Sequence, residues 1–237
     1  MQAMILAAGL GTRFKPWTDN HPKALAMVNG KSLLERNIVY LQQFGISEVM
    51  VNVHHFADQI IETIKRNDGW NSHITISDES DQILETGGGL KKASWYFPTA
   101  SFVVMNVDIL TDLDLAAMIR FHQSEKPLAT LAVTDRKTTR YFLFDQHSNL
   151  TGWRNTQTKE EKISVETSDT VQKAFSGIHI IDPRIFPLIH ENGKFSIVDA
   201  YLELARTETI KGFDHSRSRL VDVGRTSSVA EAESLFP

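Results

Sequence analysis

The feature that most constrains the fold is a glycine-containing loop directly after a short apolar run near the N-terminus. Residues 4–6 are Met-Ile-Leu, typical of a buried strand, and residues 7–16 are AAGLGTRFKP. Small residues leaving a strand let backbone N–H groups approach phosphate oxygens, because no bulky side chain stands between them. The cations Arg13, Lys15 and Lys23 follow at once. Amide groups combined with fixed positive charge predict a site for a nucleoside triphosphate.

Other kinds of glycine loop fit this segment less well. Gly9 and Gly11 after a strand also begin a dinucleotide-binding fingerprint, but Phe14 stands at the third glycine position. A Walker A loop would continue as Gly-Lys-Ser or Gly-Lys-Thr, which is absent. A purely structural glycine turn would leave the clustered cations without a purpose.

Apolar periodicity predicts that strands and helices alternate through the first half of the chain. Ser32 and Glu35 form a capping box that begins one helix, and Gly45 should end it. This order implies a mostly parallel sheet covered on both faces, with ligands beyond the carboxyl ends of its strands. The predicted strands are residues 2–7, 48–53, 74–77 and 102–106; helices are predicted at 33–45, around Ile60–Ile64, from Gly87–Gly89 toward Trp95, and at 114–123.

The second half of the sequence is less regular. We found no internal repeat and no low-complexity linker, so a single domain is expected. The polar residues 154–170 predict an exposed loop or mobile flap. The remaining predictions are neighbouring strands at 129–133 and 141–144, a strand at 174–181 interrupted by Gly177, a strand at 220–223, and helices from Asp182-Pro183, at 195–204 and at 227–235.

The composition excludes several classes of function. The net charge of -4 gives no general attraction to nucleic acid. The absence of cysteine excludes disulfides, thiolate metal sites and a cysteine nucleophile. No apolar run approaches the roughly 18 residues of a membrane span, and Met1 leads directly into the first strand without room for a leader. A cytoplasmic protein without membrane or nucleic-acid partners is therefore expected.

Two aspartates occupy places where a carboxylate is costly to hold. Asp108 ends an apolar strand, and Asp222 follows the apolar pair Leu220 and Val221. Such a carboxylate must be solvated, paired or bound to a metal ion. A helix cap or a turn is the alternative for Asp108, although Asp112 or Asp114 would also suit that role.

These motifs resemble those of the sugar-1-phosphate nucleotidyltransferases, also called NDP-sugar pyrophosphorylases. The resemblance covers residues 4–45 and returns at 85–89 (ETGGG), 106–108 (NVD), 175–178 (FSGI) and 221–224 (VDVG). The short length and the ETGGG segment are most similar to the small bacterial N-acetylmuramate-1-phosphate uridylyltransferases. The family resemblance implies a single α/β domain with a Rossmann-like, mostly parallel mixed sheet flanked by helices.

The resemblance also implies a reaction. A sugar 1-phosphate oxygen attacks the α-phosphorus of a nucleoside triphosphate, and pyrophosphate leaves, so that alignment and charge neutralisation provide most of the catalysis. About residues 1–125 would bind the nucleotide, and about 126–237 the sugar phosphate. The implied partners are these two substrates, with UTP favoured over GTP, and the protein would be a monomer or a small homo-oligomer.

Site residues follow from the same resemblance. Arg13 would bind the leaving phosphates, Lys23 would steady the phosphates at the reacting centre, and Asp108 and Asp222 would hold one Mg²⁺. The other implied nucleotide contacts are Ala8, Gly9, Gly11, Thr12, Asn52, Gly87 and Gly88; the sugar-phosphate contacts are Lys23, Trp153, Lys173, Gly177 and Asp199. Stacking of Trp153 on a sugar and its burial in the core are equal alternatives.

The sequence departs from the family pattern at two positions, and other functions fit part of the motif set. Val107 stands where the family often has glycine, and Arg225 where it usually has threonine. The alternatives are a guanylyltransferase for mannose or heptose 1-phosphate, a cytidylyltransferase for phosphocholine, and a non-catalytic nucleotide-sugar-binding regulatory protein. Retention of both aspartates argues against a regulatory protein, because a sensor need not keep both metal carboxylates.

Overall fold

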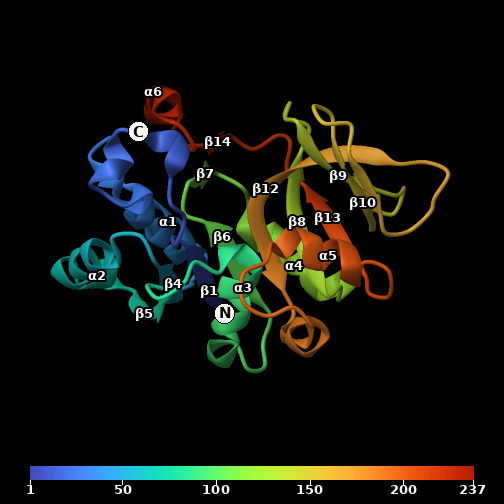
Figure 1. Ribbon diagram of the computed structural model, residues 1–237, viewed down its shortest axis with the longest axis horizontal. Helices are drawn as coiled ribbons and strands as arrows, with labels where there is room; N and C mark the ends of the chain where they lie inside the picture. Colours follow the sequence, from blue (N-terminus) through green and yellow to red (C-terminus); the bar gives the residue numbers. More distant parts are fainter.

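A mixed sheet runs through the centre of the computed structural model, which describes residues 1–237 (Figure 1). The strand order is β11-β10-β9-β12-β6-β1-β4-β5, with β8 paired to β12 and β13 paired to β8. The strands are β1 Gln2–Leu6, β2 Met27–Val28, β3 Lys31–Ser32, β4 Glu48–Val53, β5 His73–Asp78, β6 Phe102–Asn106, β7 Ile109–Thr111, β8 Ala129–Thr134, β9 Arg140–Phe144, β10 Leu150–Asn155, β11 Glu161–Ile163, β12 Val171–Ile181, β13 Ile210–Asp214 and β14 Leu220–Asp222. The α/β fold predicted from the sequence is thus confirmed.

Helices cover both faces of this sheet. The α-helices are α1 Leu33–Gln42, α2 Ala57–Arg66, α3 Glu85–Lys92, α4 Leu115–Glu125, α5 Ile197–Leu204 and α6 Val229–Leu235. None of them has both the length and the apolar character needed to span a membrane. In Figure 1, α6 lies beside the N-terminal segment, where Asn29 donates a hydrogen bond to the backbone oxygen of Glu233 at 2.8 Å. Helix α6 therefore packs against the turn between β2 and β3.

Burial on both faces explains the parallel centre of the sheet. In β1, Ala3 and Ile5 belong to one hydrophobic cluster, whereas Met4 and Leu6 belong to the other. Successive strand residues point to opposite faces, so an uninterrupted apolar strand needs cover on both sides. β1 pairs in parallel with β4 and β6, and β4 with β5, as the alternating pattern predicted.

The helix ends differ slightly from the prediction. The Ser32 side chain accepts a hydrogen bond from the Glu35 N–H at 3.1 Å, which confirms the cap of α1. The helix ends at Gln42, before Gly45, which has a φ of 71°. Helix α3 begins at Glu85, so the three glycines lie inside it rather than opening it, and it ends at Lys92, before Trp95.

The second half departs further from the sequence-based predictions. β8 and β9 are not neighbours: β12 pairs with β8 through residues 174–181 and with β9 through residues 171–173. The predicted loop at 154–170 includes the end of β10 and all of β11, which pair as an antiparallel hairpin. Gly177 interrupts β12 as expected, with a φ of 73° and a register shift between Phe175 and His179. The short β7 and the strand β13 were not predicted.

Candidate active site

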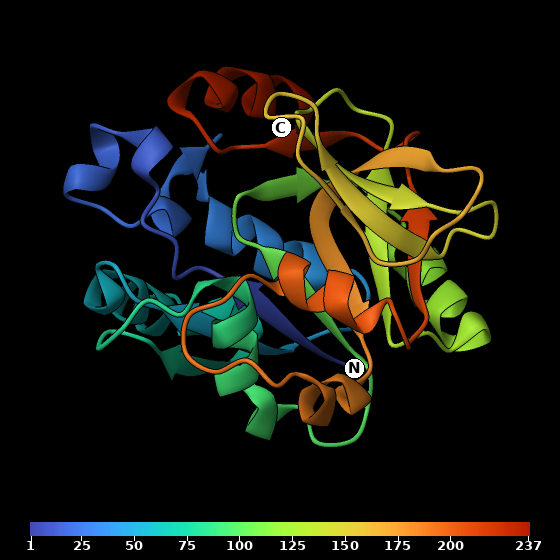
Figure 2. The same cartoon turned by 45° about the vertical axis from the view of Figure 1, so that its right-hand side comes forward.

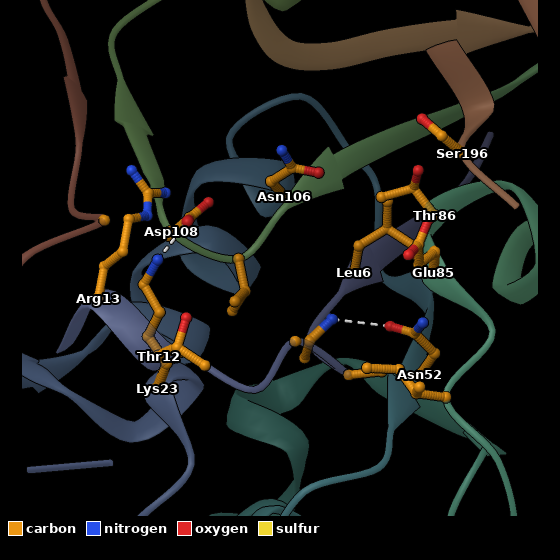
Figure 3. Close-up of a pocket in the computed structure, with 17 residues that line it drawn as sticks. Leu6, Thr12, Arg13, Lys23, Asn52, Glu85, Thr86, Asn106, Asp108 and Ser196 are labelled. Carbon is orange, nitrogen blue, oxygen red and sulfur yellow. Dashed lines mark hydrogen bonds and ion pairs between the residues drawn. The ribbon is translucent and has the colours of Figure 1, made fainter. Parts of the chain in front are cut away.

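A cavity of about 460 Å³ opens at the carboxyl ends of β1, β4 and β6 (Figure 3). This is the edge of the sheet where ligands of parallel α/β proteins bind. Residues predicted from the sequence that line it are Ala8, Gly9, Gly11, Thr12, Arg13, Lys23, Asn52 and Asp108. The structure therefore brings most of the predicted nucleotide contacts into one cavity.

The loop after β1 needs its glycines for different reasons. Gly11 has a φ of 61°, and a Cβ there would lie 2.9 Å from Thr18 Cγ2 and 3.1 Å from Lys23 Cβ. Glycine is required at that position because both the backbone conformation and the close packing disfavour a side chain. A Cβ on Gly9 would have no atom within 4 Å, so the backbone there faces open space. A ligand can approach the Gly9 backbone directly.

One end of the cavity is charged (Figure 3). The Lys23 ammonium group forms an ion pair with the Asp108 carboxylate, and both side chains are largely buried. Arg13 lies nearby: a Cβ on Gly224 would be 3.0 Å from Arg13 Nη2 and 2.7 Å from Asp222 Oδ1. Two cations and two carboxylates thus gather at this end, as phosphate and metal chemistry requires.

The pairing of β7 with β14 brings the two aspartates together. Asp222 lies opposite Ile109 in this antiparallel pair, and the Val223 N–H donates to the Asp108 backbone oxygen at 2.8 Å. Asp222 Oδ1 is buried and has no hydrogen-bond partner. Burial and the charge of Asp108 raise the pKa of the Asp222 carboxyl group, whereas Lys23, Arg13 and Arg136 oppose this rise. This unpartnered oxygen fits a cation ligand.

The aspartate pair cannot enclose a metal ion by itself. No group of three or more histidine, aspartate or glutamate side chains is placed to hold an ion. Mg²⁺ is commonly bound through one or two carboxylates together with substrate phosphates and water. Asp108 and Asp222 fit that mode of binding, with the remaining ligands coming from the substrate.

The opposite end of the cavity is uncharged apart from Glu85 (Figure 3). Asn52 accepts a hydrogen bond from the Ala7 N–H at 2.7 Å and donates one to Glu79 at 2.8 Å. These bonds hold the start of the glycine loop against β4. Thr86 and Ser196 also line this end, and sequence reasoning did not identify them. This end of the cavity is polar and lies away from Arg13 and Lys23, so it suits a nucleobase better than a phosphate.

Gly87 and Gly88 do not line the cavity. A Cβ on Gly87 would lie 2.3 Å from a ring carbon of Phe195, and one on Gly88 would lie 2.0 Å from the Gly193 oxygen. These glycines allow α3 to pack closely against the segment before α5, which crosses beside α3 in Figure 2. The structure gives their predicted contact with the base no support, because both backbone N–H groups already donate to the Phe195 oxygen.

A second cavity of about 230 Å³ adjoins the first and shares Asn106 with it. Trp153, Gly177 and Asp222 line it. A Cβ on Gly177 would lie only 2.7 Å from Asn106 Nδ2, so the bulge in β12 keeps this junction open. Asp222 in the second cavity and Asp108 in the first place the aspartate pair where the two cavities meet.

Two predicted sugar-phosphate contacts lie outside both cavities. Lys173 Nζ is 2.7 Å from Asp135 Oδ1 and 2.5 Å from Asp214 Oδ2, so its charge is already neutralised. Asp199 is exposed and pairs with Lys162 at 2.8 Å. The cations that do line the second cavity are Arg136 and Arg140, which sequence reasoning missed. The basic cluster in residues 136–140 (RKTTR) was the available signal.

Curated relatives with similar sequences are named as nucleotidyltransferases. The chain is 28% identical to an N-acetylmuramate alpha-1-phosphate uridylyltransferase of Neisseria meningitidis over 99% of this chain and 98% of that protein. It is 43% identical to the Caulobacter vibrioides protein of the same name, over 45% of each chain. It is 29% identical to a UTP–glucose-1-phosphate uridylyltransferase of Synechocystis over 83% of this chain. The matches to the last two relatives span only 45% and 53% of their lengths.

Solved structures share the fold of this chain. A putative glucose-1-phosphate thymidylyltransferase from Bacillus anthracis superposes with a TM-score of 0.83 at 19% identity, covering 99% of this chain and 94% of that chain. HddC from Yersinia pseudotuberculosis, solved with GMP-PN, gives a TM-score of 0.79 at 24% identity, covering 100% and 99%. At these identities the likeness establishes the fold. The family model described as "Nucleotidyl transferase" matches residues 2–235, so this chain belongs to the nucleotidyl transferase family.

Proposed function

We propose that this chain transfers a nucleotidyl group from a nucleoside triphosphate, with UTP preferred, to a sugar 1-phosphate and releases pyrophosphate. The observation that carries the proposal is the meeting of Asp108 and Asp222 at the junction of two cavities. One cavity has the cations and open backbone that suit a triphosphate, and the other has room for the acceptor. A transfer reaction needs two substrates to meet at one point in this way.

Each charged residue has a distinct part in the proposed reaction. Arg13 neutralises the departing β- and γ-phosphates, and Lys23 orients the phosphates beside Asp108, while N–H groups of the loop after β1 hold the triphosphate in place. Asp108 and Asp222 are the residues that would hold Mg²⁺, which when bound supplies neutralisation of the α-phosphate oxygens. The protein thus provides alignment and charge, without forming a covalent intermediate.

The preference for UTP rests on the names of the relatives already described, which are uridylyltransferases. GTP is the second candidate, because a mannose-1-phosphate guanyltransferase of Yarrowia lipolytica is 24% identical over all of this chain. CTP is the third, through a choline-phosphate cytidylyltransferase of Streptococcus pneumoniae, 49% identical over only 59 residues. The named relatives therefore differ in the nucleotide that their names specify.

A substrate matrix tests the proposal. Purified protein with MgCl₂ is incubated with UTP, GTP, CTP or dTTP against N-acetylmuramate, glucose, mannose and heptose 1-phosphates and phosphocholine, and pyrophosphate release is measured. We expect the highest kcat/KM for UTP with one of the sugar 1-phosphates. Replacing MgCl₂ with EDTA should stop release. Binding of NDP-sugars without pyrophosphate release for any pair would instead support a regulatory binding protein.

A further inference from the structure

The second cavity must hold an anion if the acceptor is a sugar phosphate. The acceptor phosphate has to reach the α-phosphorus near Asp222, so a neighbouring cation is needed to offset the carboxylate charge. Lys173, the lysine expected from the sequence, is bound to two aspartates and lines neither cavity. Arg13 and Lys23 line only the first cavity, so a cation within the second cavity must come from another segment of the chain.

Arg136 meets this requirement. It lies in the turn between β8 and β9, lines the second cavity together with Asp222, and is half-buried. Its Nη2 donates to the Phe175 backbone oxygen at 2.9 Å, which anchors one side of the guanidinium group. Its Nε is buried and has no partner. A buried donor without an acceptor is costly unless a ligand provides one.

Arg140, the other cation of the cavity, is less suited to this task. Its side chain is exposed, so its charge is screened by solvent. No side-chain hydrogen bond holds Arg140 against the wall of the cavity. Arg136, by contrast, is held next to the bulge at Gly177 by its bond to Phe175. A guanidinium held in this way presents several donors in fixed directions, which suits phosphate oxygens.

We propose that Arg136 binds the phosphate group of the acceptor and so determines that this enzyme accepts phosphorylated sugars. The inference rests on the proposed function. It assigns to Arg136 the phosphate contact that the sequence had suggested for Lys173. The buried Nε gains its missing acceptor only when the acceptor phosphate enters the second cavity.

The test compares Arg136→Gln with the matched control Lys137→Gln. Lys137 is exposed, adjacent in sequence and outside both cavities, so its replacement removes the same charge without touching the site. In Arg136→Gln we expect KM for the sugar 1-phosphate to rise by about tenfold or more, the loss for a charged hydrogen bond. KM for the triphosphate should change by less than about twofold in both variants. Arg136→Lys should restore part of the loss.

Inhibition by inorganic phosphate separates ligand binding from a structural role. In the wild-type protein, phosphate should compete with the sugar 1-phosphate, and this competition should weaken in Arg136→Gln by a factor similar to the rise in KM. Equal rises in both KM values, or unchanged phosphate inhibition, would overturn the inference. If Arg136→Gln does not fold, Arg136→Lys provides the same comparison. Absence of pyrophosphate release by the wild type would instead refute the proposed function.

Discussion

Residues 1–125, the half in which we propose that the nucleotide binds (the nucleotide half), differ from residues 126–237, the proposed acceptor half, in how their buried polar groups are satisfied. In the nucleotide half, Lys23 pairs with Asp108, and Asn52 is bonded on both sides. Four of the five buried side-chain atoms without a partner lie in the acceptor half: Thr134 Oγ1, Arg136 Nε, His215 Nδ1 and Asp222 Oδ1. Of these residues, Arg136 and Asp222 line the second cavity, where a ligand can satisfy their atoms, whereas Lys23, Asp108 and Asn52 of the first cavity are already paired.

The aspartate pair gives the largest expected effect, because it joins the two halves. Asp108→Asn and Asp222→Asn should each lower kcat by at least about a thousandfold, since each weakens the proposed metal site and the field around the phosphates. Circular dichroism and thermal unfolding should show an intact fold. As a control, Asp19→Asn alters an exposed carboxylate paired with Lys15 and should leave kcat unchanged.

A double substitution sharpens this prediction. If Asp108 and Asp222 act as one unit, the double variant should lose little more activity than either single variant. Fully additive losses would show that the two halves contribute independently. Wild-type rates in either single variant would refute the metal assignment.

Removing Arg13 should have the next largest effect, and it should be confined to the nucleotide side. Arg13→Ala should cost about 2–4 kcal/mol of transition-state stabilisation, comparable to the loss of one preorganised donor. The quantity to measure is kcat/KM for the triphosphate at saturating acceptor. Lys15→Ala is the matched control, because Lys15 is exposed and bound to Asp19. Equal losses in the two variants would mean that loop charge in general, rather than Arg13, is responsible.

The contact between α3 and residues 193–197 tests how firmly the halves are joined. In Gly88→Ala the new methyl group would meet the Gly193 oxygen at 2.0 Å, which should lower the free energy of unfolding by about 1–3 kcal/mol. Gly9→Ala meets no atom within 4 Å and should leave stability nearly unchanged while it reduces activity. Urea unfolding of both variants measures the difference. Unchanged stability in Gly88→Ala would show that residues 193–197 can shift to accommodate the methyl group at little cost.

Stability should also depend on pH, through buried histidines in both halves, since burial lowers the pKa of His122 in the nucleotide half to about 4. Burial lowers the pKa of His179 to about 3 and that of His215 to about 4. In the unfolded chain these histidines have a pKa of about 6.5, so the unfolded state binds more protons than the folded state below that pH. The free energy of unfolding should be highest above about pH 6.5 and fall as the pH decreases toward 4.

Urea unfolding at several pH values between 7.5 and 4.5 checks this expectation. His179→Gln should reduce the slope of stability against pH, because one proton-binding group is removed from the unfolded state. The wild-type slope retained in this variant would mean that groups other than His179 are responsible. The same experiment with Arg136→Gln gives a comparison, because the positive charge of Arg136 helps to lower the pKa of His215.

The sequence located the strands of the nucleotide half well and those of the acceptor half less well. β4 and β6 have the predicted bounds, because fully buried parallel strands appear as short apolar runs between clear turn residues. β8 and β9 were predicted as strands but assigned the wrong partner, because their antiparallel pairing with β12 joins residues far apart in the sequence, such as Thr134 with Ala174 and Phe144 with Val171. The hairpin of β10 and β11 was missed because its outer strand is polar and exposed.

Candidate site residues divide in the same way. Gly11, Arg13 and Lys23 belong to one local loop, where the spacing of small and charged residues already indicates the chemistry. Lys173 and Arg136 are both cations of the acceptor half, and the sequence does not show which of them is paired with carboxylates. The structure does, because Asp135 and Asp214 surround Lys173, while Arg136 Nε is left without a partner.

The sequence by itself determined the glycine loop with its clustered cations, the α/β pattern of the first half and the presence of two costly aspartates. These depend on short-range spacing and on the burial of continuous apolar runs. Only the tertiary structure decided that Asp108 and Asp222 meet, that Gly87 and Gly88 pack against protein, and which cations face the second cavity. Each of these depends on a contact between segments far apart in the chain, and such contacts leave no local pattern.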